Sequence, residues 1–425
     1  LGSANAYNET LSISGENYLQ ALIERERAVG LFLPTISFAP SYSFQDRTAA
    51  GGSDDALNSP LNTQGNIFNG FRDVAQIRRA AATAEERRQI LFDVQQSLLL
   101  DVARVYYQVL RAEASARVLG YSVDLQNSLL ERAREIRRLG GGRPLDVAQA
   151  NAQLQATRVS LIQAQSDVRT GRELLTFLAG RPVGQRALVD GFVLPATLPS
   201  REALQDEALR TRPNILAARA NVQAARQNVS AQFNRYFPSL SVNFNYFLQR
   251  DSVPTNLNWT GLLNFNLPIF SALQIESSVR QAWSQYRQAV LDESLQTREA
   301  RQQVAVAYEQ YRTSDERIKA LAAELEAAGE SLRLARAAYE LQQNTYLDVQ
   351  TAVDAELRAR LALVSEQYIN KVLFLSLLRA IGHIDDVVRY ASTTRPATTQ
   401  PAGLPATLPA TAPLSPPGPV TRPAN

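Results

Sequence analysis

The sequence predicts a mostly α-helical protein with a smaller β part, in which one structural unit occurs twice. Three observations lead to this fold class. The chain matches itself at an offset of 202 residues. Short segments alternate between apolar and polar side chains, and two segments of about 70 residues keep a helical apolar period without proline. Each copy is therefore expected to join a β-hairpin to a very long helix.

The internal repeat is visible residue by residue. Tyr106 aligns with Tyr308, and Leu145-Asp146-Val147 aligns with Leu347-Asp348-Val349, without a gap between 68 and 180. A period this long is unlike the 20–50 residues of solenoid repeats. It indicates a gene duplication, and we expect repeats at 1–192 and 193–385.

The apolar periods divide each repeat into the same elements. The first repeat is expected to hold a short helix at about 9–30, a hairpin at about 35–68, a long helix at about 71–139 and a return helix at about 145–180. The second holds a helix at about 201–233, a hairpin at about 239–270, a long helix at about 272–342 and a return helix at about 346–382. The Pro/Thr/Ala-rich tail at 386–425 cannot bury a core and is expected to be disordered.

The hairpin strands carry one apolar and one polar face. In the second repeat Leu240, Val242, Phe244, Tyr246 and Leu248 alternate with serine, asparagine and glutamine, whereas the strand at about 57–68 is poorly patterned. A half-buried sheet of an α+β protein would also alternate. Strands of about 10–13 residues can cross a bilayer when tilted, and a face of Ser, Thr and Asn suits a water-filled lumen. We therefore interpret the β part as transmembrane.

Such a sheet predicts an oligomer. Four strands cannot close on themselves, and in lipid every strand edge must be paired. Several chains must therefore contribute to one barrel, since barrels of this kind need at least about eight strands.

The long helical segments carry a heptad seam. In the second repeat this seam includes Ala300, Val304, Ala307, Tyr311 and Ser314, which step by four and three residues. Such helices supercoil with neighbours, and about 70 residues make a rod of roughly 100 Å.

Composition excludes several classes of function. The net charge is +3, and the arginine pairs lie among acids, so they are interpreted as solvated helix faces and no nucleic acid is expected as a partner. There is no Cys and one histidine, and no catalytic triad or phosphate loop is present, so we expect no enzyme, no metal site and no cofactor. No run approaches 18 apolar residues, which argues against a transmembrane helix. The absence of Met suggests a processed or truncated start.

Two other classes share some of these features. A soluble periplasmic coiled-coil adaptor or scaffold would also show long heptads and a hairpin. A hydrolase or surface-binding protein on an α+β fold would need a concentrated polar cluster, which the sequence does not display.

The chain resembles the TolC-like outer-membrane efflux protein family over roughly residues 9–385. The resemblance rests on the duplication, on Phe-Pro-Ser-Leu-Ser at 237–241, on Asn-Leu-Pro-Ile-Phe at 266–270 and on Leu-Asp-Val at both helix turns. It implies a passive exit duct of a tripartite efflux or secretion system, with a trimeric 12-stranded β-barrel (four strands per chain) in the outer membrane, continued by a long α-helical barrel in the periplasm. It also implies a periplasmic adaptor (membrane fusion) protein, an inner-membrane transporter acting indirectly, and outer-membrane lipid as partners.

The resemblance assigns roles to the two helix turns. Asp146 and Asp348 are expected at a periplasmic gate, although a carboxylate that caps a helix N-terminus would explain them too. The adaptor would dock on the turn residues, namely Gly140, Gly141, Gly142, Arg143, Leu145 and Val147 in the first repeat and Asn344, Thr345, Tyr346, Leu347 and Val349 in the second. The sequence departs from the family pattern at Gln342, where a glycine is frequent, and at Gln149 and Thr351, where some members have an acid.

Overall fold

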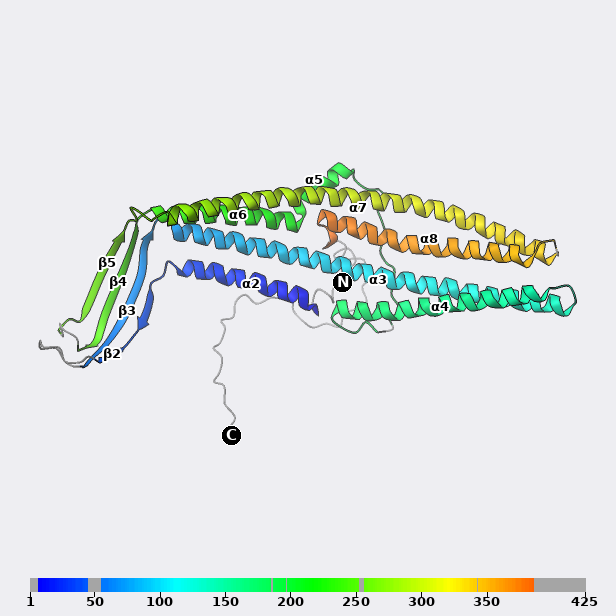
Figure 1. The fold of residues 1–425 in the computed structure, drawn as a ribbon, viewed down its shortest axis with the longest axis horizontal. Coiled ribbons are helices and arrows are strands. Elements are labelled where there is room, and N and C mark those ends of the chain that lie inside the picture. Colours follow the sequence, from blue (N-terminus) through cyan, green and yellow to red (C-terminus); the bar gives the residue numbers. More distant parts are fainter. Residues whose placement is uncertain are drawn as a thin grey trace, which may run out of the picture.

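The computed structural model describes residues 7–44, 55–184, 186–195, 197–251, 256–341 and 343–385. Part of the Gly-rich loop of the first hairpin (45–54), Gln342 and the Pro/Thr/Ala-rich tail (386–425) lie outside these residues. The described residues form an elongated molecule in which a β-sheet at one end continues into a layer of long helices (Figure 1).

The helices repeat in length and spacing. They are α2 (Glu9–Gly30), α3 (Arg72–Arg138), α4 (Pro144–Ala179), α5 (Arg201–Thr211), α6 (Pro213–Phe233), the short 3-10 turn η1 (Asn234–Tyr236), α7 (Gln274–Glu340) and α8 (Tyr346–Ile381). Both α3 and α7 contain 67 residues, and both α4 and α8 contain 36. The first residues of α3 and α7 are 202 apart, as are those of α4 and α8. The sequence offset is thus present in the helix boundaries themselves.

Helix α3 lies at the centre of the helical layer. It contacts α2 and α4 on one side and α6 and α8 on the other, and α6 and α8 in turn contact α7 (Figure 1). The end of α4, at Gly180, meets the start of α2, and the end of α8, at Gly382, meets the start of α6. A Cβ atom on Gly180 would lie 2.5 Å from the carbonyl oxygen of Tyr7, and one on Gly382 would lie 3.0 Å from Cα of Arg212. Both glycines also have a positive φ. Each junction therefore requires glycine for two reasons, the close backbone neighbour and the backbone conformation.

One expected helix is two helices. The segment at about 201–233 breaks between α5 and α6 at Arg212, whose backbone is extended (φ −70°, ψ 122°). Pro213 explains the break, because the residue before a proline is pushed out of the α region while proline itself suits the first position of the next helix. The prediction of one continuous helix was wrong at this point.

The heptad seam packs as expected. In α7 the seam side chains Ala300, Val304, Ala307, Tyr311 and Ser314 are all buried. Val304 and Ala307 pack with Leu204 and Ala208 of α5 and with Leu377 and Ile381 of α8. This part of α7 is therefore held by a mainly apolar seam, as in supercoiled helices.

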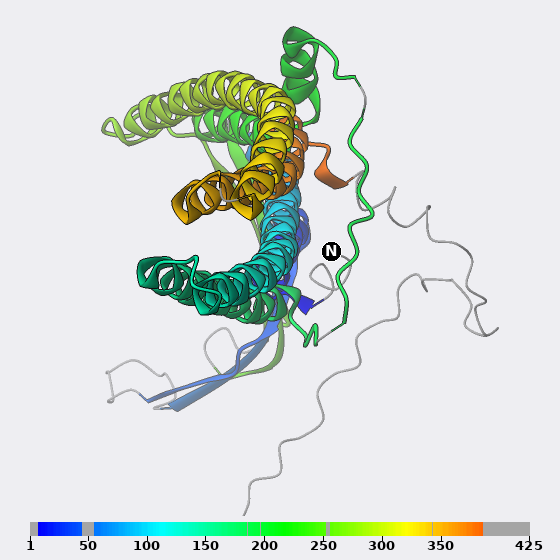
Figure 2. The ribbon, with the colours of Figure 1, turned by 90° about the vertical axis from the view of Figure 1, so that its right-hand side faces the viewer.

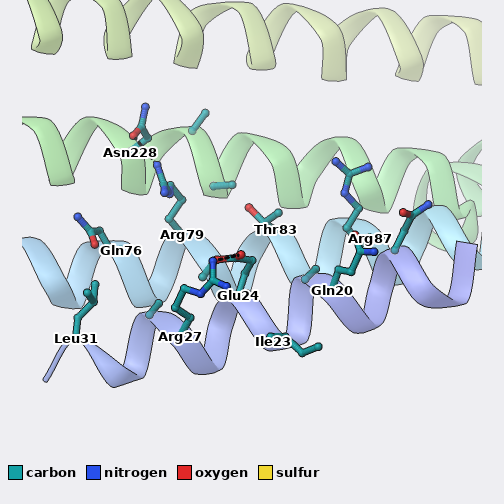
Figure 3. A pocket seen from close by; sticks show the side chains of 16 residues that line it. Gln20, Ile23, Glu24, Arg27, Leu31, Gln76, Arg79, Thr83, Arg87 and Asn228 are labelled. Carbon is teal, nitrogen blue, oxygen red and sulfur yellow. Dashed lines mark hydrogen bonds and ion pairs between the residues drawn. The ribbon is translucent and has the colours of Figure 1, made fainter. Parts of the chain in front are cut away.

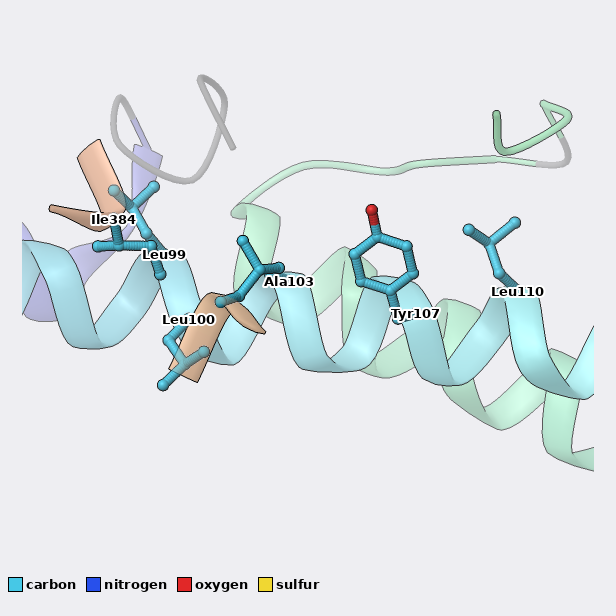
Figure 4. Close-up of a cluster of buried hydrophobic side chains, with 7 residues drawn as sticks. Leu99, Leu100, Ala103, Tyr107, Leu110 and Ile384 are labelled. Atoms are coloured by element: carbon cyan, nitrogen blue, oxygen red, sulfur yellow. The ribbon is translucent and has the colours of Figure 1, made fainter. Parts of the chain in front are cut away.

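The helical layer is curved, with a concave and a convex side (Figure 2). The irregular segment after α4 runs along the convex side, where the hydroxyl of Tyr106 donates to the carbonyl of Val189 (2.7 Å). Leu188 and Phe192 of that segment pack against a buried cluster drawn in Figure 4, which consists of Leu99, Leu100, Ala103, Tyr107, Leu110, Leu375 and Ile384. The connection between the repeats is thereby fixed to α3.

The sheet has five strands, two of which lie one after the other along the same edge of a third strand. They are β1 (Thr35–Phe38), β2 (Ser41–Phe44), β3 (Asp55–Asn69), β4 (Ser239–Arg250) and β5 (Trp259–Asn266), in the antiparallel order β1-β3-β4-β5, with β2 also paired to β3. The first expected strand is interrupted at Ala39-Pro40, since proline lacks the N–H that a ladder needs. The strand that is poorly patterned in sequence, β3, pairs along most of its length, with register shifts between Asn58 and Pro60 and between Asn66 and Phe68. Bulges at these shifts account for its irregular alternation.

The register aligns side chains of one kind across the sheet. Phe38, Leu61, Tyr246 and Trp259 lie opposite one another in one row, and Ser37, Asn62, Asn245 and Thr260 form the next. Residues directly opposite share a face, and adjacent rows point to opposite faces. The sheet therefore has an apolar, aromatic face and a polar face, on which Asn245 donates to Thr260 Oγ1 (3.3 Å).

The exposed apolar face is not covered by the chain itself. Leu263 is 62% exposed and Phe265 is 68% exposed. In the described sheet, β1 and β2 form one edge and β5 forms the other.

One helix of the described chain, α8, has the length and composition of a membrane span. By length and composition α8 is apolar enough to cross a membrane, although no uninterrupted apolar run suggested it. Its apolar residues have partners within the chain, because Leu375 packs against α3 and Leu377 against α5 and α7. The composition of α8 is thus accounted for by its position among three other helices.

Candidate functional site at the helix turns

Two helix turns lie together at the end of the molecule remote from the sheet (Figure 1). The first joins α3 to α4. Its backbone closes α3 with bonds from the N–H of Gly140 to the carbonyl of Arg137 (3.0 Å) and from Gly141 to Ile136 (3.1 Å). Gly140 has φ +84°, and a Cβ on Gly142 would lie 3.0 Å from the backbone nitrogen of Arg137. The glycine run is thus explained by a positive φ and a close backbone approach.

The second turn is built without those glycines. The N–H of Leu341 bonds to the carbonyl of Ala337 (3.2 Å), and that of Gln343 bonds to Ala338 (2.8 Å). Gln342, where the family pattern has a glycine, lies outside the described residues. The two turns close their helices similarly with different residues.

Asp348 forms a capping box at the start of α8. Its Oδ2 accepts from the N–H of Thr345 (2.9 Å) and from the Thr345 hydroxyl (2.7 Å), while its own N–H donates to Thr345 Oγ1 (3.4 Å). These bonds favour the charged form, so the Thr345 hydroxyl and N–H lower the pKa of Asp348. The capping interpretation of this aspartate is correct, and the carboxylate remains exposed.

Asp146 occupies the equivalent position in a different environment. The helix start at Arg143 has no side-chain cap, and Pro144 is the first helical residue. The Asp146 side chain is only 13% exposed, and its Oδ1 lies 3.5 Å from Arg143 Nη2. The two aspartates are therefore equivalent in sequence and distinct in chemistry.

Asp146 lies close enough to two tyrosines of the second repeat, Tyr339 and Tyr346, to raise the pKa of their hydroxyl groups. Burial, and secondarily the Asp146 charge, raises the pKa of Tyr339. Burial also raises the pKa of Tyr346 to about 12, with smaller contributions from Tyr339, Asp354 and Asp146. The two rings meet edge to face with centroids 6.1 Å apart. These tyrosines stay neutral and lie where the first repeat meets the second.

Two of the expected docking residues are core residues. Tyr346 is 1% exposed and Val349 is fully buried, in a cluster with Leu129, Leu130, Ala150, Leu154 and Val353. Sequence reasoning placed them on a docking surface because they flank the turn, and it was wrong about their accessibility. The other turn residues reach the surface at least partly, and Leu145 and Leu347 are 56% and 60% exposed.

A polar chain that the sequence analysis missed connects the two helical hairpins. The Tyr346 hydroxyl donates to Gln350 Oε1 (3.2 Å), Gln350 Nε2 donates to Asp354 Oδ1 (3.0 Å), and Gln153 of α4 donates to the same oxygen (2.8 Å). Gln153 has Ala355 as its equivalent in the repeat, and Asp354 has Ala152. The only sequence signal for this link is that polar residues replace alanine at repeat-equivalent positions.

The described residues offer no metal site at the turns or elsewhere, since no group of three His, Cys, Asp or Glu side chains converges among them. The turns combine exposed leucines, two carboxylates and a hydrogen-bonded link between repeats. This set of groups can bind a protein or control a passage, and it lacks a nucleophile paired with a base.

Comparison with known proteins shows the family to which the chain is similar. Residues 19–181 and 204–383 match the outer membrane efflux protein family. The chain is 23% identical over 364 residues to the outer membrane protein TolC of Vibrio cholerae, covering 83% of each chain. It is 23% identical to the cation efflux system protein CusC of Escherichia coli K12, covering 74% of this chain and 70% of CusC.

Solved structures show the same fold. A crystal structure of CusC superposes with a TM-score of 0.80 at 20% identity, covering 90% of both chains. The open state of the Neisseria gonorrhoeae MtrE outer membrane channel superposes with a TM-score of 0.79 at 20% identity, covering 90% of this chain and 88% of that one.

Proposed function

Because the chain belongs to the outer membrane efflux protein family, we propose that it is the passive exit duct of a tripartite efflux or secretion system. It lies in the outer membrane of a Gram-negative-type bacterium, and its helical part extends into the periplasm. Solutes delivered by a periplasmic adaptor and pump assembly leave the cell through it. No cofactor takes part and no covalent chemistry occurs.

One observation carries this proposal: apart from a few positions such as Thr63 and Leu262, the rows of the sheet alternate between apolar and polar side chains across the four strand positions. Exposed aromatic and aliphatic side chains on one face are suited to lipid, and a face of Ser, Thr and Asn is suited to water. A sheet that covered a protein core would bury its apolar face, but Leu263 and Phe265 are well exposed in the single chain.

An oligomer follows from the sheet edges, and the family resemblance implies that it is a homotrimer. The edge formed by β1 and β2 and the edge formed by β5 would each leave backbone groups unpaired in lipid, which a bilayer does not tolerate. Pairing β5 of one copy with β1 and β2 of the next removes every edge, and three copies make the barrel of about 12 strands. The concave sides of the three helical layers then enclose a tunnel (Figure 2).

The repeats give the tunnel its regular wall. We treat residues 1–192 and 193–385 as the two units, each of which supplies one helical hairpin of equal length. A trimer would then present six hairpins, whose turns lie at the end remote from the membrane.

The helix turns are the proposed docking site for the periplasmic adaptor. Leu145 and Leu347 are equivalent and exposed at the two turns, so each hairpin offers an apolar contact near its end. An inner-membrane transporter would act through the adaptor and would not touch this chain. Tyr346 and Val349 would support the turn from the core.

Asp146 and Asp348 are proposed to contribute to a gate at this end. Rings of carboxylates in a narrow passage attract cations and can hold a constriction through pairing. The exposed Asp348 can act on solutes directly, whereas the largely buried Asp146 acts on Arg143 and on the tyrosines of the second repeat.

Membrane fractionation followed by an unboiled gel tests the proposal. A detergent-extracted species larger than the 46.9 kDa chain is expected, with discrete conductance steps in planar bilayers. Recovery of the protein solely as a monomer in the soluble fraction would favour a periplasmic coiled-coil adaptor or scaffold instead.

A further inference from the structure

A groove on the helical layer is lined mainly by polar and charged side chains of α2, α3 and α6 (Figure 3). Its volume is about 990 Å³. We call it the arginine groove, because Arg27 of α2 and Arg79 and Arg87 of α3 line it with a single acid, Glu24. It lies in the half of the helical layer that is nearer to the sheet (Figure 1).

Positive charge dominates the arginine groove. Arg27 pairs with Glu24 at 2.8 Å, with both side chains well exposed. Arg79 donates from Nη1 to the neutral Asn228 of α6 (3.2 Å), an interaction that fixes the guanidinium and leaves its charge in place. Two of the three guanidinium charges are therefore not balanced by the groove's own residues.

The acid beside Arg87 in the sequence is Glu86. Glu86 does not line the groove, and burial raises its pKa although the Arg87 charge opposes the rise.

The heptad register of α3 places the arginine groove on the concave side. Gln76 and Thr83 in the groove are separated by seven residues from each other and by multiples of seven from Ser97 and Arg104, so these residues form one stripe. Tyr106, which binds the convex connection, is two residues from Arg104 and thus about 200° around the helix. The groove and the connection lie on opposite sides of α3.

We propose that the arginine groove recruits anionic solutes inside the tunnel, namely molecules that carry a carboxylate, sulfonate or phosphate group. This inference rests on the proposed channel function, because the concave side faces a tunnel only in the trimer. Guanidinium groups bind such oxyanions through directed N–H donors, and a charged wall raises the local concentration of counter-charged solute. Three copies would repeat the groove around the tunnel axis.

Paired substitutions on α3 test this inference. Arg79→Gln with Arg87→Gln removes two charges from the groove, and glutamine can still donate to Asn228. Arg78→Gln with Arg88→Gln removes two charges from the same turns of α3. Arg78 lies a multiple of seven residues before Tyr106, on the convex side, and Arg88 pairs there with Glu85. Circular dichroism and thermal unfolding establish that both variants are folded, and Arg87→Gln alone provides a second groove variant.

The first readout is the reversal potential of the channel in a KCl gradient. The groove variant should shift the chloride-to-potassium permeability ratio toward potassium by at least about twofold, whereas the convex variant should match the unmodified channel. The second readout is binding of tripolyphosphate to the detergent-purified protein by calorimetry, which does not need a conducting pore. The groove variant should bind at least about threefold more weakly at low salt.

The two readouts separate the inference from the channel function. A change confined to the groove variant in either readout supports the arginine groove as an anion site. The unmodified protein could bind tripolyphosphate without forming a conducting channel. If the groove variant then loses this binding, the anion site is supported and the proposed channel function is refuted. Equal permeability ratios and equal binding in the two variants would overturn the inference.

Discussion

The side-chain amide of Gln153 on α4 donates a 2.8 Å hydrogen bond to Oδ1 of Asp354 on α8. This bond joins the hairpin of the first repeat to that of the second, a short distance behind the turns. Because Asp354 also accepts from Gln350, the carboxylate is held by both repeats.

Replacing Gln153 by alanine should loosen the two hairpins. A hydrogen bond to a charged group contributes about 1.5–3 kcal/mol when partly buried, so the free energy of unfolding should fall by about this amount or less. If the turns form a gate, the variant should also conduct more in planar bilayers. Gln155→Ala is the matched control, since Gln155 bonds only within its own helix to Asn151. Equal conductance in the two variants would count against a gating role for the link.

Removing the Thr345 hydroxyl should cost an amount of stability that depends on pH in a predictable direction. The folded pKa of Asp348 is lowered, so the capping box stabilises the protein above the ordinary pKa of 3.8 and loses this effect as pH falls through the lowered pKa. The melting temperature of Thr345→Ala should therefore lie below that of the unmodified protein at pH 7, and the difference should shrink as the pH falls below 3.8. Thr351→Ala, which removes a bond to the Leu347 carbonyl, should show a difference that does not change with pH.

The two helix junctions at Gly180 and Gly382 should not tolerate a methyl side chain. Gly180→Ala and Gly382→Ala combine a positive φ with a close backbone neighbour, so each should lower the free energy of unfolding by at least about 1–2 kcal/mol. Gly329→Ala serves as the control, because a Cβ there meets nothing within 4 Å and the site is inside α7. That change should stabilise the protein by about 0.5–1 kcal/mol in a denaturant titration.

Arginine substitutions at two adjacent positions of β5 should show which face of the sheet contacts lipid and which contacts water. Leu263→Arg places a charge on the apolar face and should destabilise the membrane-inserted protein by about 2–4 kcal/mol if the residue lies near the bilayer centre. Asn264→Arg places the same charge on the polar face and should leave the oligomer intact. The yield of the oligomer on an unboiled gel measures both, and a larger loss from Asn264→Arg would reverse the assignment of the faces.

Neutralising the single acid of the arginine groove should act in the opposite sense to removing its arginines. Glu24→Gln frees Arg27 from its ion pair and adds one unit of positive charge to the groove. The permeability ratio should move toward chloride. Glu26→Gln, a neighbouring change outside the groove lining, is the control, and a shift of the same size in both would show that location does not matter.

The helices were largely predictable from sequence because their signals are local. Gly140 and Pro144 mark the end of α3 and the start of α4, and the observed boundaries differ from the expected ones by a residue or two. The break at Arg212 also had a local signal, Pro213, which the amphipathic period obscured. The bulges of β3 could not be predicted, because they depend on how its register fits β4.

The candidate site was less predictable, since its chemistry depends on neighbours from the other repeat. The sequence treats Asp146 and Asp348 as equivalent, but Asp146 is largely buried near Tyr339 and Asp348 caps its own helix. The burial of Tyr346 follows from packing against α3 and α4, which no pattern around residue 346 reveals.

Equal helix lengths have a consequence for the symmetry of the far end. Since α3 with α4 and α7 with α8 match residue for residue in length, all six hairpins of a trimer would end at one level. Their turns differ, with Gly-Gly-Gly-Arg alternating with a turn that contains Gln343, Asn344 and Thr345. The rim of such a trimer would therefore be sixfold in shape and threefold in composition, and a ring of identical adaptor subunits would meet two kinds of docking site in alternation.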